Sequence, residues 1–158
     1  MKSAAIQTLF NVTEVELVYR NKVNPAERPK ITSSSTAYDI LMEAWDMNKI
    51  ELVEQFSILL LDRSNSCIGI STISQGGISA CVVDPKVVFA TALKARASSI
   101  ILAHNHPSGN LKPSEADKTI TKSLVAGGHI LDLRVLDHLI VTPRSYYSFA
   151  DEGGLRLD

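Results

Sequence analysis

The sequence predicts an α/β fold, in which a mixed sheet carries helices on both of its faces. Two observations predict this class. Short runs of β-branched and apolar residues alternate with segments whose apolar residues recur at helical spacing, and two of the β-rich runs follow each other as a hairpin. The chain has 158 residues and is 45% hydrophobic, which is enough to bury the core of one globular unit.

The N-terminal region predicts a strand, a loop and a helix. Residues 14–20 mix β-branched, aromatic and charged residues in rough alternation, as in an exposed or edge strand. Residues 24–35 contain two prolines and three consecutive serines, which predict a loop. Ser35 is the expected N-cap of the next helix, whose apolar face comprises Ile40, Leu41, Ala44 and Trp45.

A hairpin is predicted in the middle of the chain. Residues 56–61 and 67–73 are apolar, β-rich runs, and the polar residues 62–66 between them suit a tight connection. Two glycines then break the second run, and a further short strand is expected at residues 78–83.

A helix and a buried strand are predicted next. Asp84 followed by Pro85 is typical of an N-cap and a first helical residue, and the helix is expected to reach about Arg96. Residues 99–103 are a compact apolar run, which predicts a strand covered on both faces. This strand leads directly into His104, at the carboxyl end where open α/β sheets bind ligands.

The last third predicts another helix and strand. After a loop at residues 107–113, apolar residues at helical spacing indicate a helix from about Ser114 to Ala126. Gly127-Gly128 is the expected end of this helix. Residues 131–141 then predict a last long strand.

Composition and charge argue against several classes of protein. Lys and Arg number 16 against 17 Asp and Glu, a net charge of -1, so no overall basic field attracts nucleic acid. Cys67 and Cys81 lack Cys-x-x-Cys spacing and are expected to be reduced, small core residues. No apolar run approaches the roughly 20 residues of a membrane helix, and the N-terminus carries only a short apolar trace. We therefore expect a cytoplasmic protein.

The segment from His104 to Asp117 has the form H-x-H-P, then six residues, then S-x-x-D. Two histidines separated by one residue on an extended backbone point to the same side, so both imidazoles reach one ion. The turn that begins at Pro107 brings the next helix back over the strand end, where Asp117 supplies a third ligand. Two nitrogens and one carboxylate leave a fourth tetrahedral position for water, as in catalytic zinc sites.

A hydrolase built on this site also needs a group that takes a proton from the water and passes it to the leaving amine. Glu54, before the strand at residues 56–61, is the candidate, and Glu51 is its competitor three residues earlier. Ser114 is expected on the same helix face as Asp117, where its hydroxyl can hydrogen-bond a developing oxyanion.

Each of these residues also has a simpler interpretation. Ser114 and Asp117 fit a variant capping box, and a capping serine retains lone pairs for a second role. An isolated histidine is more often a polar loop residue than a ligand, but the spacing of His104 and His106 with the acid favours a metal site. Glu54 alone would be interpreted as a solvated carboxylate. The adjacent pair 137–138, Asp-His, faces opposite sides of a strand, which favours a supporting role over a second metal site.

The pattern H-x-H-P with S-x-x-D at this spacing resembles the JAMM (MPN-plus) metalloproteases, and Asn105 with Pro-Ser-Gly at 107–109 resembles their RadC-like branch. The resemblance covers roughly residues 36–154. It includes Glu-Gln-Phe at 54–56, Ser-Gln-Gly-Gly at 74–77, Leu-Asp-His at 136–138 and Tyr-Ser-Phe at 147–149.

The resemblance implies a three-layer α/β/α fold of the cytidine-deaminase type. It implies metal ligands at His104, His106 and Asp117, a catalytic glutamate at Glu54 and an oxyanion serine at Ser114. The implied cofactor is Zn2+ and the implied reaction is hydrolysis of an amide, often an isopeptide bond, in a peptide or protein substrate. RadC-like proteins also carry a DNA-repair label, and short forms resemble those found on mobile elements.

We expect an N-terminal strand and loop extension over residues 1–35 and the catalytic domain over residues 36–158. RadC-like chains commonly carry a helix-hairpin-helix-like region before this domain, and the 35 residues here do not resemble one. The competing function is a non-catalytic metal-binding or DNA-repair-associated binding module. A zinc deaminase would need H-x-E and P-C-x-x-C elements, which are missing from the sequence. An HNH nuclease and a serine hydrolase lack their own motifs.

Overall fold

A computed structural model describes residues 16, 18–78 and 80–156 of the protein. In chain order the elements are η1 (Pro25–Glu27), α2 (Ser34–Ala44), β1 (Gln55–Leu61), β2 (Cys67–Gln75), α3 (Pro85–Lys94), β3 (Ser99–Asn105), α4 (Glu115–Ile130), β4 (Arg134–Val141) and β5 (Tyr146–Ser148).

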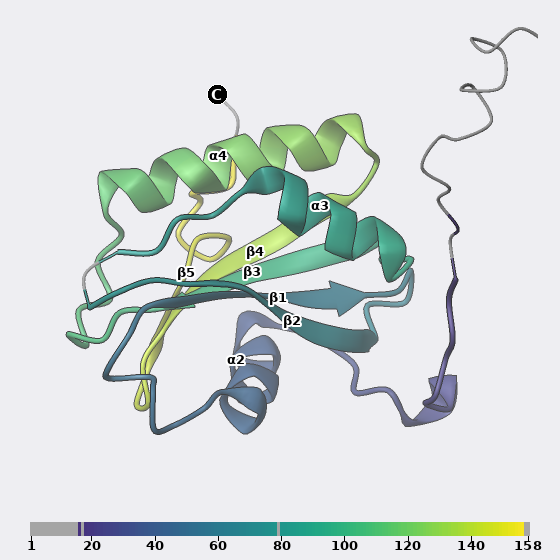
Figure 1. The fold of residues 1–158 in the computed structure, drawn as a ribbon, viewed down its shortest axis with the longest axis horizontal. Coiled ribbons are helices and arrows are strands. Elements are labelled where there is room, and N and C mark those ends of the chain that lie inside the picture. Colours follow the sequence, from purple (N-terminus) through teal and green to yellow (C-terminus); the bar gives the residue numbers. More distant parts are fainter. Residues whose placement is uncertain (1–15, 17, 79, 157–158) are drawn as a thin grey trace, which may run out of the picture.

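The strands form a five-stranded sheet in the order β2-β1-β3-β4-β5. Strands β3 and β4 pair in parallel, whereas β1 pairs antiparallel with β2 and β3, and β5 pairs antiparallel with β4. Helix α2 covers one face of this sheet, and α3 and α4 cover the other (Figure 1). The predicted mixed sheet with helices on both faces is confirmed, as is the hairpin β1–β2.

The buried side chains form one apolar cluster on each face of the sheet. In β3, Ile101 and Ala103 pack on the α2 side together with Leu41, whereas Ile100 and Leu102 pack on the side of α3 and α4. Every residue of β3 is buried, because the strand lies in the middle of the sheet and both of its faces are covered. Its carboxyl end therefore emerges from a rigid core.

Strand β4 contains a register shift that determines which way its side chains point. Ile100 pairs with Val135, but Ile101 pairs with Asp137, so Leu136 is an extra residue in β4. An extra residue reverses the alternation of all side chains that follow it. As a result His138 faces α4, on the same side of the sheet as Val135.

Three predicted features near the N-terminus and at residues 78–83 are wrong. Glu16 and residues 18–20 are not in a strand, and the rest of the strand predicted at residues 14–20 lies outside the described residues. Ser33, not Ser35, is the N-cap of α2, and its hydroxyl accepts the Thr36 N–H. Residues 78 and 80–83 form no strand, because the chain turns back there through a hydrogen bond from Gly77 N to Ala80 O.

The predicted end of the third main helix is also wrong. Helix α4 continues past Gly127 and Gly128 to Ile130. A Cβ atom on Gly128 would lie 2.3 Å from the Leu133 carbonyl oxygen, so this glycine serves the close approach of helix and chain rather than a helix stop. Strand β4 consequently begins at Arg134 instead of residue 131. Helix α3 has the predicted Asp84 cap and ends at Lys94.

The short strand β5 is an element that the sequence did not predict. It pairs with the end of β4 after a turn in which Thr142 N donates to Ser145 O. Over the described part of the chain, no helix combines the length and the apolar composition needed to cross a bilayer.

Candidate metal centre

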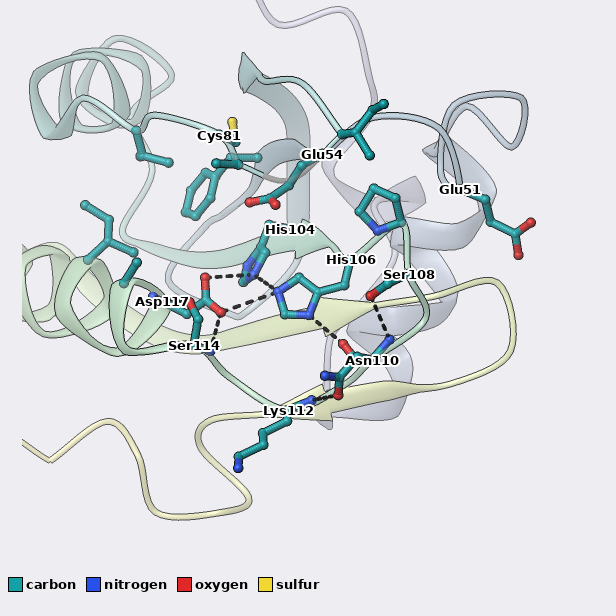
Figure 2. A pocket seen from close by; sticks show the side chains of 17 residues that line it. Glu51, Glu54, Cys81, His104, His106, Ser108, Asn110, Lys112, Ser114 and Asp117 are labelled. Carbon is teal, nitrogen blue, oxygen red and sulfur yellow. Dashed lines mark hydrogen bonds and ion pairs between the residues drawn. The ribbon is translucent and has the colours of Figure 1, made fainter.

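Three side chains converge where β3 ends and α4 begins. His104 is in β3, His106 follows it by two residues, and Asp117 lies in the first turn of α4. The two Nε2 atoms are 3.0 Å apart. Asp117 Oδ1 is 3.2 Å from His104 Nε2, and its Oδ2 is 3.4 Å from His106 Nε2. Figure 2 shows the two rings and the carboxylate pointing toward one another.

These spacings fit a metal ion. Ligand atoms about 2.0–2.1 Å from a tetrahedral zinc lie roughly 3.3 Å from one another. The three donor pairs here are 3.0, 3.2 and 3.4 Å apart. Two imidazole nitrogens and one carboxylate are also the donor types that zinc prefers when a fourth position stays open. The cluster of His104, His106 and Asp117 can therefore hold a metal ion.

The remaining nitrogens of both rings contact groups outside this cluster. His106 Nδ1 is 2.5 Å from the Asn110 carbonyl oxygen. Because a carbonyl only accepts, His106 carries a proton on Nδ1, and Nε2 is the nitrogen that faces the cluster. His104 Nδ1 is 2.8 Å from His138 Nε2. Such outer contacts orient metal-ligating rings in zinc proteins.

A capping box holds Asp117 in place. Ser114 Oγ accepts the Asp117 N–H at 3.1 Å, and Asp117 Oδ2 accepts the Ser114 N–H at 2.7 Å. The interpretation of Ser114 and Asp117 as a helix cap is confirmed. It does not compete with metal binding, because a carboxylate has lone pairs for the backbone and for a metal.

The charges in the cluster are strongly coupled. Burial alone would raise the pKa of Asp117, but hydrogen bonds from His104 and His106 outweigh it and hold the pKa well below its usual range. The hydrogen bond to Asp117 raises the pKa of His106, although partial burial opposes that shift. The site thus favours a cationic group between an ionised carboxylate and two imidazoles.

Glu54 lies across the cleft from these three residues. Its side chain points toward the histidines, whereas Glu51 points away (Figure 2). Burial raises the pKa of the Glu54 carboxyl, the charges of His104 and His106 lower it, and Asp117 raises it further, with a net rise. The geometry therefore favours Glu54 over Glu51 as the group that faces the candidate metal position.

The backbone around Glu54 is held on both sides. Glu54 N donates to Gly77 O at 3.0 Å, and Gly76 N donates to Glu54 O at 2.8 Å. These two bonds extend the pairing of β1 with β2 to the residue before the strand. Glu54 is therefore presented from an ordered strand end.

Asn105 binds the backbone of the segment that leads into β1, and its side chain is fully buried. Its Oδ1 accepts the Gln55 N–H at 2.7 Å, and its Nδ2 donates to the carbonyl oxygens of Ile50 and Val53 at 2.7 and 2.8 Å. The residue between the two candidate histidine ligands thus positions the candidate base. The sequence reasoning used Asn105 only for the family resemblance and missed this role.

The cluster lies at the base of a cleft of about 700 Å³. Its lining includes the polar residues Ser108, Asn110, Lys112 and Ser114 and the apolar residues Phe56, Ile78, Val83 and Ile120. Cys81 lines the cleft as a half-buried free thiol, whereas Cys67 is a free thiol buried in the α2-side cluster.

The pair Asp137 and His138 does not form a second metal site. Asp137 accepts the Ser148 hydroxyl at 2.6 Å and the Ala150 N–H at 2.9 Å. His138 instead contacts His104 on the opposite side of β4. The expectation that these neighbours face opposite sides of a strand is confirmed.

Comparisons with known proteins give the family of this chain. Residues 31–155 match the RadC-like JAB domain family. The chain is 48% identical to a UPF0758 protein of Flavobacterium johnsoniae over 125 residues, which is 78% of this chain and 53% of that protein. It is 42% identical to the UPF0758 protein YfjY of Escherichia coli over 127 residues, which is 78% of this chain and 79% of that protein. The chain spans about half the length of several of the curated relatives that it matches. It belongs to the RadC-like JAB domain family.

Proposed function

We propose that this protein is a zinc-dependent metallohydrolase that cleaves peptide or isopeptide bonds. One observation carries the proposal, namely that two imidazole Nε2 atoms and a carboxylate converge at metal-ligand spacing opposite a half-buried glutamate. A binding scaffold that needs only a structural metal has no use for that glutamate, because structural zinc sites are closed by protein ligands.

His104, His106 and Asp117 would hold the zinc ion. Bound there, zinc would supply Lewis acidity, which lowers the pKa of a water to roughly 7 and polarises a carbonyl group. Asp117 holds its charge because the neighbouring imidazoles keep its pKa low. The two histidines would bind the ion as neutral donors through Nε2.

Glu54 acts as the general base in this proposal. Its carboxylate takes a proton from the attacking water and passes that proton to the nitrogen of the scissile amide, which leaves as an amine. The partial burial that raises the pKa of Glu54 makes it a better proton acceptor than an ordinary exposed carboxylate. The bonds to Gly76 and Gly77 limit the movement of its backbone between the two transfers.

Ser114 stabilises the oxyanion in this proposal. Its oxygen accepts the Asp117 N–H, which leaves the hydroxyl hydrogen available to donate to the carbonyl oxygen of the substrate. The apolar residues that line the cleft would contact substrate side chains, and we propose a peptide or protein as the substrate class. The two free thiols agree with a reducing, cytoplasmic compartment, which we also propose.

The test uses two probes, a proteome-derived peptide library and peptides joined through a lysine side-chain amide. The zinc-loaded protein is incubated with each probe, and new termini are identified by mass spectrometry. We expect cleavage that a chelator abolishes, that Glu54→Gln lowers by at least about 100-fold, and that the matched control Glu51→Gln retains. Equal cleavage by Glu54→Gln and the parent would contradict the proposal. Metal-independent DNA binding that falls steeply with salt, without cleavage, would favour the binding-module alternative.

A further inference from the structure

A chain of buried polar groups connects two of the candidate ligands behind the metal centre. Thr121 Oγ1 donates to the backbone carbonyl of Asp117 at 2.6 Å and lies 2.6 Å from His138 Nδ1. His138 Nε2 lies 2.8 Å from His104 Nδ1. Thr121 and His138 are fully buried and His104 is 2% exposed, so water does not replace these contacts.

The protons in this chain have only one consistent order. A hydroxyl has a single proton, and Thr121 gives it to the Asp117 carbonyl, which cannot donate in return. The contact between Thr121 and His138 must then be donated by His138 Nδ1–H. A neutral His138 with its proton on Nδ1 has a lone pair on Nε2, which accepts the Nδ1–H of His104.

The surroundings of His138 favour its neutral form. The ring is completely buried, and its two nitrogens contact the Thr121 hydroxyl and the His104 ring, whereas a carboxylate would be needed to offset a buried positive charge. Its ring is stacked on Phe149 with centroids 4.8 Å apart and lies edge-on to Phe56 at 5.5 Å. The two aromatic rings leave His138 little freedom to turn away from its partners.

We infer that Thr121 and His138 are positioning residues that keep a proton on His104 Nδ1, so that Nε2, which faces His106 and Asp117, is the nitrogen of this ring that binds a metal. With the opposite order, a neutral His104 would carry its only proton on Nε2, the nitrogen that faces the other two candidate ligands. The chain begins at the backbone of one candidate ligand and ends at the ring of another, so it arranges both before any metal arrives. This inference rests on the metal binding in the proposed function, but the proton order itself belongs to the metal-free protein.

Thr121→Val tests the chain because valine has nearly the shape of threonine without its hydroxyl. His138 Nδ1–H loses its acceptor, so the favoured tautomer of His138 becomes Nε2–H, which then donates to His104 Nδ1. We expect this switch in long-range ¹H–¹⁵N correlation spectra, which distinguish the two imidazole tautomers. We also expect the zinc dissociation constant, measured by competition with a chelating dye, to rise about 10–100-fold.

Two variants serve as controls. Thr121→Ser retains the hydroxyl and should keep the parent tautomer and zinc affinity. Thr119→Val removes an exposed hydroxyl that makes the same kind of bond, to the Glu115 carbonyl at 2.9 Å, and should change neither. A purely structural role of Thr121 would alter stability without moving the tautomer of His138.

The outcomes separate this inference from the proposed function. An Nε2–H tautomer of His138 in the parent protein would overturn the inference, even if Thr121→Val fails to fold. An unchanged tautomer and zinc affinity in Thr121→Val would overturn it as well. A parent protein that binds no zinc but shows the Nδ1–H tautomer would contradict the proposed function and leave the proton order standing.

Discussion

The two faces of the sheet are built from the same strands but bury different chemistry. On the α2 side the apolar cluster includes the Cys67 thiol, and the buried Asp137, on the face of β4 opposite His138, binds the Ser148 hydroxyl and the Ala150 backbone. On the side of α3 and α4 an apolar cluster of similar kind continues into His104, His138 and Thr121, which are also buried. The difference is that the buried polar groups on the side of α3 and α4 connect to a candidate metal ligand, whereas Asp137 on the α2 side binds a neighbouring strand and loop.

Buried polar groups are tolerated on the second face because they are hydrogen-bonded to one another. A buried polar atom without a partner costs about 1–3 kcal/mol, so a connected chain is needed where single groups would destabilise the core. His138 contacts both His104 and Thr121, and Thr121 also contacts the Asp117 backbone. The site is therefore part of the core rather than an addition to its surface.

The largest effect on activity is expected at Glu54, which faces the candidate metal ligands but is not one of them. Glu54→Gln should lower the rate of amide cleavage by about 100-fold or more, because glutamine cannot accept the proton of the water. The zinc content, measured by elemental analysis, should remain that of the parent. Loss of zinc together with cleavage would show instead that Glu54 binds the metal.

A matched pair of core leucines compares the two faces directly. Leu41→Ala on α2 and Leu124→Ala on α4 should each lower the free energy of unfolding by about 2–5 kcal/mol, measured in denaturant, because each leucine is fully buried. Only Leu124→Ala should also weaken zinc binding, since α4 carries Asp117 and Thr121. Equal zinc affinities in the two variants would contradict the inference that only the face covered by α3 and α4 supports the candidate metal centre.

A smaller loss of stability and activity is expected when the hydrogen bonds of Asn105 to the segment before β1 are removed. Asn105→Asp keeps an acceptor for Gln55 N–H but removes the donors to Ile50 and Val53. Unpartnered buried carbonyls should lower the free energy of unfolding by about 1–3 kcal/mol, and cleavage should fall because Glu54 is less firmly placed. An unchanged cleavage rate at unchanged zinc content would show that Asn105 does not position Glu54.

The smallest effect concerns pH and the metal-free protein. Mainly because of burial, the pKa of Glu54 is raised in the folded state, so its contribution to stability is present below the unfolded pKa of roughly 4.3 and is lost as pH rises through the folded pKa. Glu54→Gln should therefore be more stable than the parent at pH 7, and this advantage should vanish in acid. Thermal unfolding at both pH values, without metal, measures the difference, and a less stable variant at pH 7 would contradict it.

Local signals predicted much of the architecture. Asp84 and Pro85 mark the start of α3 because the cap and the proline act within one helical turn. The spacing between His104 and Asp117 predicted a shared site because a strand end, a short loop and a first helical turn can meet in few ways. Such features depend on residues that are close in the chain.

Features that depend on distant contacts could not be predicted. The extra residue Leu136 turns His138 toward α4, and only the pairing with β3 reveals it. In the sequence, Gly128 indicates the end of a helix. Its actual role, the close approach of the Leu133 carbonyl, is visible only in the folded chain. The role of Asn105 depends on backbone groups about 50 residues earlier in the chain. Ile78 was expected in a strand, but it is 75% exposed beside a turn at the rim of the cleft.

Zinc content decides whether His104, His106 and Asp117 form a metal centre. The parent, Asp117→Asn and the matched control Glu115→Gln would be purified without chelator, dialysed and examined by elemental analysis. Asparagine at position 117 can still accept the Ser114 N–H, so the helix cap survives while the anionic ligand is lost. We expect about one zinc per chain in the parent and in Glu115→Gln, and little in Asp117→Asn. Equal zinc in all three proteins, or none in the parent, would contradict the assignment of this cluster as a metal centre.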